Sequence, residues 1–384
     1  MPGAGACCKK PHPMLSTLRS VLRFQESGLI LVILALGALL YGFSGSVRAP
    51  VFERAEDGSR QRAFITDANG ERVPAFVERN KFLNAQNLAQ LAKDTSFIAI
   101  MAVGMAFVII SGGIDLSVGS IYALASVLGA LALQQFGPEG PGGDAGNWGV
   151  MLGAGICLGT AVVCGLFNGG LIVALRVHPF IITLGTMAIL RGIAFVVTKG
   201  QSVGGFPQGF RDLVRFEAGQ GLSLVPLVVM IVVTLLGWLI LARLAPGRRV
   251  YAVGGNELAS RFSGIRVERV KLGVYVMSGL CAGIAALLSL GYYGAATSGD
   301  GQGYELNVIA AAVVGGASLS GGRGSALGVV LGALIIQMIN SGIVILGIDQ
   351  NYSQIIIGSV VIAAVVLDNI NSWLSRRRMQ KPAA

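Results

Sequence analysis

The stretch Ser111–Gly119, SGGIDLSVG, places a carboxylate and several helix-weakening residues inside an apolar run that extends from Phe97 to Leu133. About 20 apolar residues suffice to cross the hydrocarbon core of a bilayer, so this run is too long for one span. Glycine inside a helix costs about 1 kcal/mol relative to alanine. The stretch therefore predicts two membrane spans separated by a glycine-rich break that presents Asp115.

Asp115 has two interpretations from the sequence. Its carboxylate could cap the second span by accepting backbone N–H bonds at the helix start. Alternatively it marks a pathway, because an acidic side chain inside the bilayer costs about 2.5–3.5 kcal/mol on insertion scales and usually faces protein or water. The two roles are compatible, and the sequence leaves both open.

The composition is that of an integral membrane protein. Hydrophobic residues make up 53% of the chain and charged residues 12%, whereas soluble domains average about 25% charged. The apolar pattern predicts an all-α, polytopic membrane protein with about ten transmembrane helices, at Gly28–Ser44, Thr95–Ile110, Leu116–Phe136, Trp148–Leu175, Phe180–Val197, Leu222–Leu241, Leu272–Tyr292, Leu306–Leu319, Ala326–Leu346 and Ile355–Ile370.

Basic residues predict the orientation of these spans, because short cytoplasmic loops retain lysine and arginine. Both termini and the basic segment 247–271 are expected in the cytosol, which requires an even number of spans. The net charge of +10 is then explained by topology and anionic lipid, with no nucleic-acid partner. The predicted organisation is a cytoplasmic head 1–27, a first transmembrane anchor 28–44, an external insert 45–94 with a possible hairpin turn at Asn69-Gly70, a membrane core 95–370 and a basic cytoplasmic tail 371–384.

The chain contains an internal repeat. Gly112–Leu131 aligns without a gap to Gly315–Leu334, with 12 identities in 20 positions. Repeated halves with corresponding glycine breaks are a common way to place a pathway at a repeat interface. The second break carries Ser318 where the first has Asp115, so the halves are not chemically equivalent.

The cytoplasmic segment predicts one short helix with both ends marked. Asn256 is a good N-cap, Glu257 suits the first turn, and Gly264 can adopt the left-handed conformation that ends a helix. Leu258 and Phe262 then share one face. So short a helix is marginal alone in water, which favours docking into a partner's groove. The alternative is a helix that lies flat on the lipid surface.

Several other chemistries find no support in the sequence. The segment GGRGS at Gly321–Ser325 lacks the spacing and the lysine of a phosphate-binding loop, so ATP would have to be bound by another subunit. The cysteines have no metal-ligand spacing, and no metal site, cofactor or enzyme activity is predicted. His178 is expected to cap a helix or to contact a loop. Arg191, inside the fifth span, is expected to pair with a carboxylate such as Asp115 or Glu305, and the alternative is that it faces a polar cavity.

Four motifs in order resemble the permease subunit of ribose- and xylose-type ABC sugar importers. They are GGIDLSVGS at Gly112–Ser120, HPFIITLGTMAILRGIA at His178–Ala194, GRRVYAVGGNELASRFSGI at Gly247–Ile265 and VIAAAVVGGASLSGGRGS at Val308–Ser325. The resemblance runs from about Phe82 to the C-terminus. The insert before Phe82 and the long head depart from the compact family pattern.

The resemblance implies a helix that contacts an ATPase subunit and a translocation path built from the breaks and span ends. The candidate ATPase-coupling residues are Gly255, Asn256, Glu257, Leu258, Ala259, Phe262 and Gly264. The candidate path residues are Gly112, Gly113, Asp115, Ser117, Asn168, Thr183, Thr186, Asn307 and Ser318. Because the predicted path has so few polar side chains, we expect its contacts with the solute to be weak.

The predicted function is therefore a multi-pass permease subunit in the bacterial inner membrane that imports a monosaccharide. Its expected partners are a cytoplasmic ATPase, an external sugar-binding protein, a second permease subunit and membrane lipid. Two alternatives stay open. One is an ion-coupled secondary transporter with Asp115 as the cation or proton site, and the other is an ABC permease for an amino acid, a nucleoside or a furanone signal.

Overall fold

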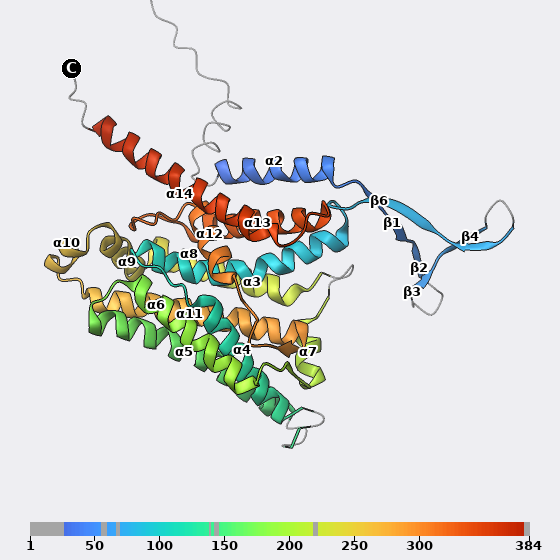
Figure 1. Cartoon of the computed structure of the whole chain (residues 1–384), viewed down its shortest axis with the longest axis horizontal. Helices are drawn as coiled ribbons and strands as arrows, with labels where there is room; N and C mark the ends of the chain where they lie inside the picture. Colours follow the sequence, from blue (N-terminus) through green and yellow to red (C-terminus); the bar gives the residue numbers. More distant parts are fainter. Residues whose placement is uncertain are drawn as a thin grey trace, which may run out of the picture.

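The computed structural model describes residues 27–54, 60–66, 70–137, 140–141, 146–217 and 222–379. The predicted head up to residue 26, the residues from 380 onward and the turn residue Asn69 lie outside the described residues. Within the described part the chain is mostly helical, which confirms the predicted all-α class (Figure 1).

Ten helices of the described chain correspond to the ten predicted spans. Seven are long and apolar enough to cross a membrane, and three apolar stretches are shorter. The ten helices are α2 (Ser27–Phe43), α3 (Ala85–Ile110), α4 (Val118–Gln135), α5 (Gly146–Leu175), α6 (Pro179–Thr198), α8 (Leu224–Arg243), α11 (Val267–Tyr293), α12 (Tyr304–Val314), α13 (Ala326–Ile345) and α14 (Tyr352–Met379).

The prediction of a full span at Leu306–Leu319 is wrong. Helix α12 has 11 residues, which at 1.5 Å per residue covers about 16 Å, roughly half of a 30 Å hydrocarbon core. The chain leaves the helix at Gly315 and Gly316, and Gly316 has a φ of +92°. A half-length helix followed by a glycine turn therefore stands where a complete span was expected.

Helix α3 is the central helix of the fold. It begins at Ala85, where the Asn84 side chain accepts a hydrogen bond from the Asn87 amide at 2.8 Å, and not at Thr95 as predicted. Its side chains from Thr95 to Ile110 are buried, and it packs against α8, α11, α12 and α13. A helix that is apolar on all sides is buried on all sides, which explains this central position.

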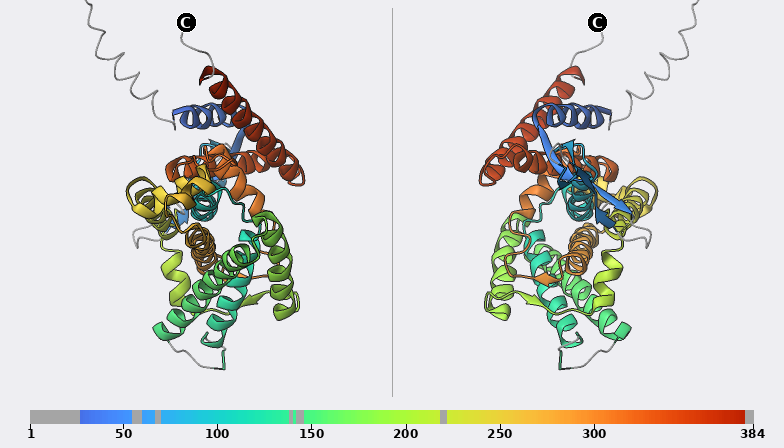
Figure 2. Two further views of the ribbon diagram at one scale, coloured as in Figure 1. Left: turned by 90° about the vertical axis from the view of Figure 1, so that its left-hand side faces the viewer. Right: turned by 90° about the vertical axis from the view of Figure 1, so that its right-hand side faces the viewer.

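The peripheral helices present apolar side chains outward. Helix α2 packs against α13 on one flank, while α5 and α6 form the opposite flank (Figure 2). Leu34 on α2, Val196 on α6 and Leu235 on α8 are each more than half exposed. Such surfaces are expected to face lipid.

Short antiparallel strands form an extension at one end of the molecule, opposite α10 (Glu257–Phe262) (Figure 1). The predicted hairpin is present, with Ile65 opposite Val73 and Gly70 at a φ of +83°. A further pair, β7 (Val203–Gly204) with β8 (Ala295–Ala296), lies in the helical body. The extension pairs β1 (Ser46–Pro50) with β6 (Phe76–Asn80), β2 (Phe52–Arg54) with β3 (Arg60–Arg62) and β4 (Phe64–Thr66) with β5 (Arg72–Pro74).

Candidate functional site

The first break, residues 111–117, begins with a tight glycine turn. The amides of Ser111, Gly112 and Gly113 donate to the carbonyls of Phe107, Ile109 and Val108 respectively. Gly112 has a φ of +83°, a conformation that favours glycine because other residues crowd their Cβ there. Two spans separated by a glycine-rich break are therefore confirmed.

Asp115 is completely buried and is bonded to both neighbouring segments. Its Oδ1 accepts from the Ser117 amide at 3.0 Å and from the Ser117 hydroxyl at 2.6 Å, and its Oδ2 accepts from the Ser278 hydroxyl on α11 at 2.8 Å. Asn168 on α5 donates to the Ser117 hydroxyl oxygen at 2.7 Å. The carboxylate thus joins α4, α5 and α11 through hydrogen bonds.

Asp115 does not cap α4 in the usual manner. The N-cap position is Ser117, and its side chain makes no capping bond, while the Asp115 carboxylate bonds the Ser117 amide just before the helix begins. Thr183 and Thr186 on α6 are buried beside this cluster, and the Thr183 hydroxyl donates to the Ile114 carbonyl at 3.3 Å. Three of the predicted path residues, Asp115, Ser117 and Asn168, therefore meet in one buried polar cluster.

The second break, residues 315–325, repeats the turn of the first. The amides of Gly315, Gly316 and Ala317 donate to the carbonyls of Ala311, Val313 and Ala312, which is the same three-bond pattern shifted by one residue from the sequence alignment. The second break is longer, because α13 begins only at Ala326. Ser318 lies here, buried, and its amide donates to the Arg323 carbonyl at 3.1 Å.

Both breaks meet at Gly254, near the end of α9 (Ala245–Gly255). The Gly322 amide donates to the Ile110 carbonyl at 2.8 Å, which ties the second break to the end of α3. A Cβ on Gly254 would overlap the Ile110 carbonyl oxygen and lie 2.7 Å from the Gly322 nitrogen. The sequence prediction of one short helix in this segment missed α9, whose amphipathic packing shows only in the tertiary structure.

Helix α10 (Glu257–Phe262) follows α9 and has the predicted ends. The Asn256 side chain accepts from the Ala259 amide at 2.9 Å, and Gly264 has a φ of +81°. Leu258 is 64% exposed and Phe262 is 84% exposed. An apolar pair this exposed at the i, i+4 spacing forms a small protruding surface on the helix.

Charged side chains hold α10 against the start of α11. Glu257 accepts from Lys271 at 2.7 Å and pairs with Arg261 at 3.2 Å. Arg261 also pairs with Glu268 at 2.7 Å. The hydrogen bond from Lys271 is the main reason that the pKa of the Glu257 carboxyl is lowered. This network orients the exposed apolar pair.

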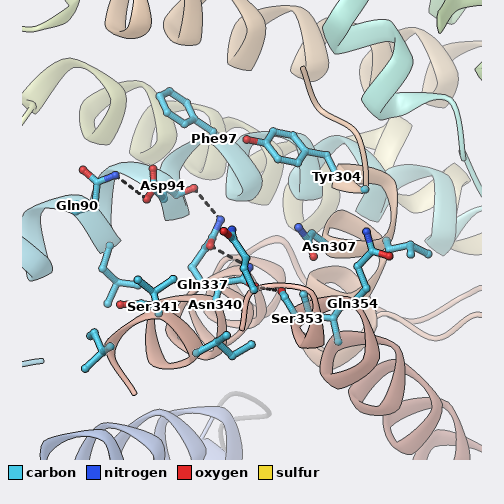
Figure 3. Close-up of a pocket in the computed structure, with 18 of the residues that line it drawn as sticks. Gln90, Asp94, Phe97, Tyr304, Asn307, Gln337, Asn340, Ser341, Ser353 and Gln354 are labelled. Carbon is cyan, nitrogen blue, oxygen red and sulfur yellow. Dashed lines mark hydrogen bonds between the residues drawn. The ribbon is translucent and has the colours of Figure 1, made fainter. Parts of the chain in front are cut away.

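A polar cavity of about 570 Å³ lies between α3, α12, α13 and α14 (Figure 3). It is in the half of the molecule nearer to the strand extension. Amide side chains dominate its wall: Asn87, Gln90, Gln302, Asn307, Gln337, Asn340, Gln350 and Gln354. Phe97, Tyr293 and Tyr304 add aromatic surface.

Hydrogen bonds order part of this wall, as Figure 3 shows. Gln90 donates to the Asp94 carboxylate at 3.0 Å and Gln337 to the Asp94 carbonyl at 3.3 Å. Asn340 donates to Gln337 at 3.3 Å and accepts from the Ser353 hydroxyl at 2.8 Å. The amides are therefore held in place by one another.

Among the described residues that line the cavity, Asp94 is the only one with an acidic or basic side chain. Lys93 pairs with it at 3.2 Å and is itself 2% exposed. The Lys93 ammonium lies 4.2 Å from the centre of the Tyr292 ring and 5.0 Å from that of Tyr293, a favourable cation–π arrangement. The cavity thus has polar groups without an uncompensated charge.

The predicted path residues and the cavity overlap only at Asn307. The residues Asp115, Ser117 and Asn168 lie in the separate buried cluster, so their place in a path stays a prediction. Sequence reasoning missed Gln90, Asp94 and Gln337, which come from helices far apart in the chain. An available signal was the pair of amides Gln337 and Asn340 inside the apolar run of α13, at positions where a membrane span is expected to be apolar.

Two further predictions have clear outcomes. His178 caps α6, because its Nδ1 accepts from the Phe180 amide at 3.3 Å. The expected carboxylate partner of Arg191 is wrong, since the guanidinium donates instead to the carbonyls of Ser298 at 3.1 Å and Asp300 at 2.7 Å. Main-chain carbonyls can satisfy an intramembrane arginine as carboxylates do.

Comparison with known proteins shows the protein family to which the chain belongs. Residues 87–365 match the family described as branched-chain amino acid transport system / permease component, and the chain belongs to that family. It is a polytopic membrane permease. No solved structure matches this chain.

Curated relatives narrow the class to sugar-type import permeases. The chain is 40% identical over 290 residues to the ribose import permease protein RbsC of Escherichia coli K12, covering 75% of this chain and 87% of the relative. It is 39% identical to the D-allose transport system permease protein AlsC of the same strain, over 76% and 86%. It is 33% identical to the autoinducer 2 import system permease protein LsrD of Yersinia enterocolitica, over 79% and 91%. The resemblance inferred from the four motifs is confirmed.

Proposed function

We propose that this chain forms the translocation path for a monosaccharide in an ABC importer. An external binding protein delivers the sugar, and a separate cytoplasmic ATPase, which binds the ATP, drives transport by gripping α10. Two permease subunits, identical or different, form the working unit. The N- and C-termini face the cytosol, so the strand extension faces outward.

The lining of the cavity favours a neutral polyhydroxy solute. Asparagine and glutamine each offer a donor and an acceptor, which suits sugar hydroxyls, and the aromatic rings offer faces for the apolar side of a sugar ring. An amino acid would need partners for both a carboxylate and an ammonium group. Asp94, already paired with Lys93, is the only acidic or basic side chain among the described residues of the lining, so this solute class is disfavoured. The relatives' names also point to ribose, allose and autoinducer 2.

The observation that carries the proposal is the exposed pair Leu258 and Phe262 on a capped helix. This helix directly follows Gly254, which contacts both breaks. Movement of α10 would therefore reach the end of α3 and the second break through main-chain contacts. Exposed apolar side chains of this kind are typical of helix-in-groove docking.

The test replaces Leu258 or Phe262 with aspartate in the full transporter. We expect loss of ATPase co-purification and of ATP-driven sugar uptake in proteoliposomes, with membrane insertion unchanged. Leu258→Met and Phe262→Leu keep an apolar surface and should keep both activities. Undiminished ATPase association in the aspartate variants contradicts the proposal.

A second measurement separates ABC import from ion-coupled transport. With ATP held constant, collapse of the ion gradient should leave uptake unchanged if a separate ATPase supplies the energy. Uptake that follows the gradient in the absence of nucleotide would favour a secondary transporter. The completely buried Asp115, without a basic partner within 4 Å in the described chain, is the residue to substitute in that case.

A further inference from the structure

A second cavity, of about 850 Å³, lies between α8, α9 and α11 at the end of the molecule that carries α10. Its inner wall is apolar, with Phe107, Ile240, Val274 and Met277. Its rim is basic, with Arg249, Arg266 and Arg269. We call this cavity the basic groove.

The basic groove extends from the rim into the depth of the membrane helices. Arg266 stands just before α11, while Met277 is ten residues beyond the first residue of that helix, about 15 Å along its axis. Ile240 and Phe107 lie within the last turns of α8 and α3. An occupant of the inner part would therefore sit at the depth of the acyl chains.

The three arginines of the rim have no acidic partner. All three are exposed, and none forms an ion pair within 4 Å with another described residue. The nearby cations Arg261 and Lys271, by contrast, are already paired with Glu257 or Glu268. The rim thus concentrates unneutralised positive charge at the mouth of an apolar slot.

We propose that the basic groove is a binding site for an anionic phospholipid. The phosphate lies among Arg249, Arg266 and Arg269, and an acyl chain follows the wall toward Met277. Basic pockets between membrane helices on the cytoplasmic side have the chemistry that anionic headgroups require, and arginine matches phosphate oxygens with paired N–H donors.

Other occupants fit these features less well. A cytoplasmic protein loop could reach the arginines, but it could not follow an apolar slot that extends about 15 Å along α11. A free phosphate ion would need the rim and leave the slot unused. A second permease copy would be expected to bring acidic side chains to the rim, yet described acidic residues are few and the Glu257 and Glu268 carboxylates are already paired.

The test measures lipid retained by the purified full-length permease in a neutral detergent, using native mass spectrometry with phosphatidylglycerol and phosphatidylcholine added in equal amounts. We expect preferential retention of phosphatidylglycerol by the unaltered chain. The combined variant Arg249→Gln, Arg266→Gln, Arg269→Gln should lower that preference at least about tenfold, since each basic residue near anionic lipid contributes substantially to binding.

Two further variants test the geometry. Gly273→Phe should fill the slot without removing charge, because Gly273 lines the groove and an added Cβ meets nothing within 4 Å. It should reduce phosphatidylglycerol retention to the level of phosphatidylcholine. The control Arg176→Gln, Arg248→Gln, Arg323→Gln removes equal charge from residues outside the groove, and it should retain the lipid like the unaltered chain.

Four results would overturn the proposal. One is equal retention of both lipids by the unaltered chain. Another is a loss in the control variant as large as in the groove variant, because charge alone would then explain binding. The third is displacement of phosphatidylglycerol by millimolar inorganic phosphate, together with normal phosphatidylglycerol retention in Gly273→Phe. That result would identify a free-anion site. Dissociation of permease pairs by Gly273→Phe with unchanged lipid retention would likewise identify a subunit interface.

Discussion

The two breaks share one backbone design but differ in chemistry. Each ends its helix with the same three main-chain hydrogen bonds and a glycine at positive φ. The first break is then secured by the buried Asp115, which three hydrogen bonds connect to Ser117 and Ser278. The second is longer and has Gly321, Gly322 and Gly324 at positive φ in place of a carboxylate. The repeat has preserved the turn, and a buried carboxylate is present only in the first copy.

This difference indicates which break can change conformation more easily. A buried carboxylate with several hydrogen bonds resists rearrangement, because each broken bond to a charged group costs about 1.5–3 kcal/mol. A glycine-rich loop fixed mainly by its neighbours can change conformation at lower cost. We therefore expect the first break to act as the fixed support and the second as the moving part, with Gly254 between them.

The largest effect is expected from Gly254→Val, which acts on both breaks at once. A valine there would overlap the Ile110 carbonyl and press on Gly322. Because these are main-chain atoms that cannot rotate aside, we expect a cost above the typical overpacking penalty of about 1–3 kcal/mol. We expect sugar uptake to fall to background and the thermal midpoint in detergent to drop. Gly170→Val on α5, where nothing lies within 4 Å of an added Cβ, is the matched control and should change neither. Normal sugar uptake by Gly254→Val would refute the idea that Gly254 links the two breaks.

The next effect separates the two breaks directly. Asp115→Ala leaves Ser117 and Ser278 without their acceptor, so we expect a loss of about 3 kcal/mol in unfolding free energy. Ser318→Ala, at the aligned position of the second break, should cost less than about 1 kcal/mol. Chemical denaturation in mixed micelles measures both. Equal losses would remove the distinction between a break that is held by a carboxylate and one that is not.

The smallest effect concerns two tyrosines, Tyr251 on α9 and Tyr275 on α11, each of which donates a hydrogen bond to one break. The Tyr251 hydroxyl donates to the Gly324 carbonyl at 2.7 Å and the Tyr275 hydroxyl to the Ile114 carbonyl at 3.2 Å. Ile114 also accepts from Thr183, whereas no second donor to Gly324 is recorded among the described residues. Tyr251→Phe should therefore cost about 1 kcal/mol and Tyr275→Phe less. ATPase stimulation by loaded binding protein should weaken only in Tyr251→Phe, and the reverse order would contradict the assignment of the moving break.

Much of this architecture could be predicted from local sequence. Apolar runs of about 20 residues located ten helices, because the bilayer sets their length and composition. Asn256 and Gly264 marked the ends of α10, and Gly112 marked the first break, since caps and left-handed turns depend on only a few neighbouring residues. The wrong prediction of a full span at Leu306–Leu319 also comes from local composition, because an apolar half-helix and its glycine turn together have the composition of a span.

The candidate solute cavity could not be predicted in this way. Asn307 was recognised, but Asp94 and Gln337 belong to helices that are far apart in the chain, and nothing local indicates that they share a wall. Lys93 looked like an ordinary residue of an external loop. Its burial between Tyr292 and Tyr293 depends on the packing of α3 against α11.

The sequence by itself determined the membrane class, the glycine breaks, the capped helix and the family, because each depends on composition or on residues close together in the chain. The tertiary structure decided that α3 is central, that both breaks meet at Gly254, and that amides from four segments surround one cavity. These features depend on contacts between residues up to hundreds of positions apart. Such contacts follow from how helices pack, and helix packing is only weakly encoded in any single stretch of sequence.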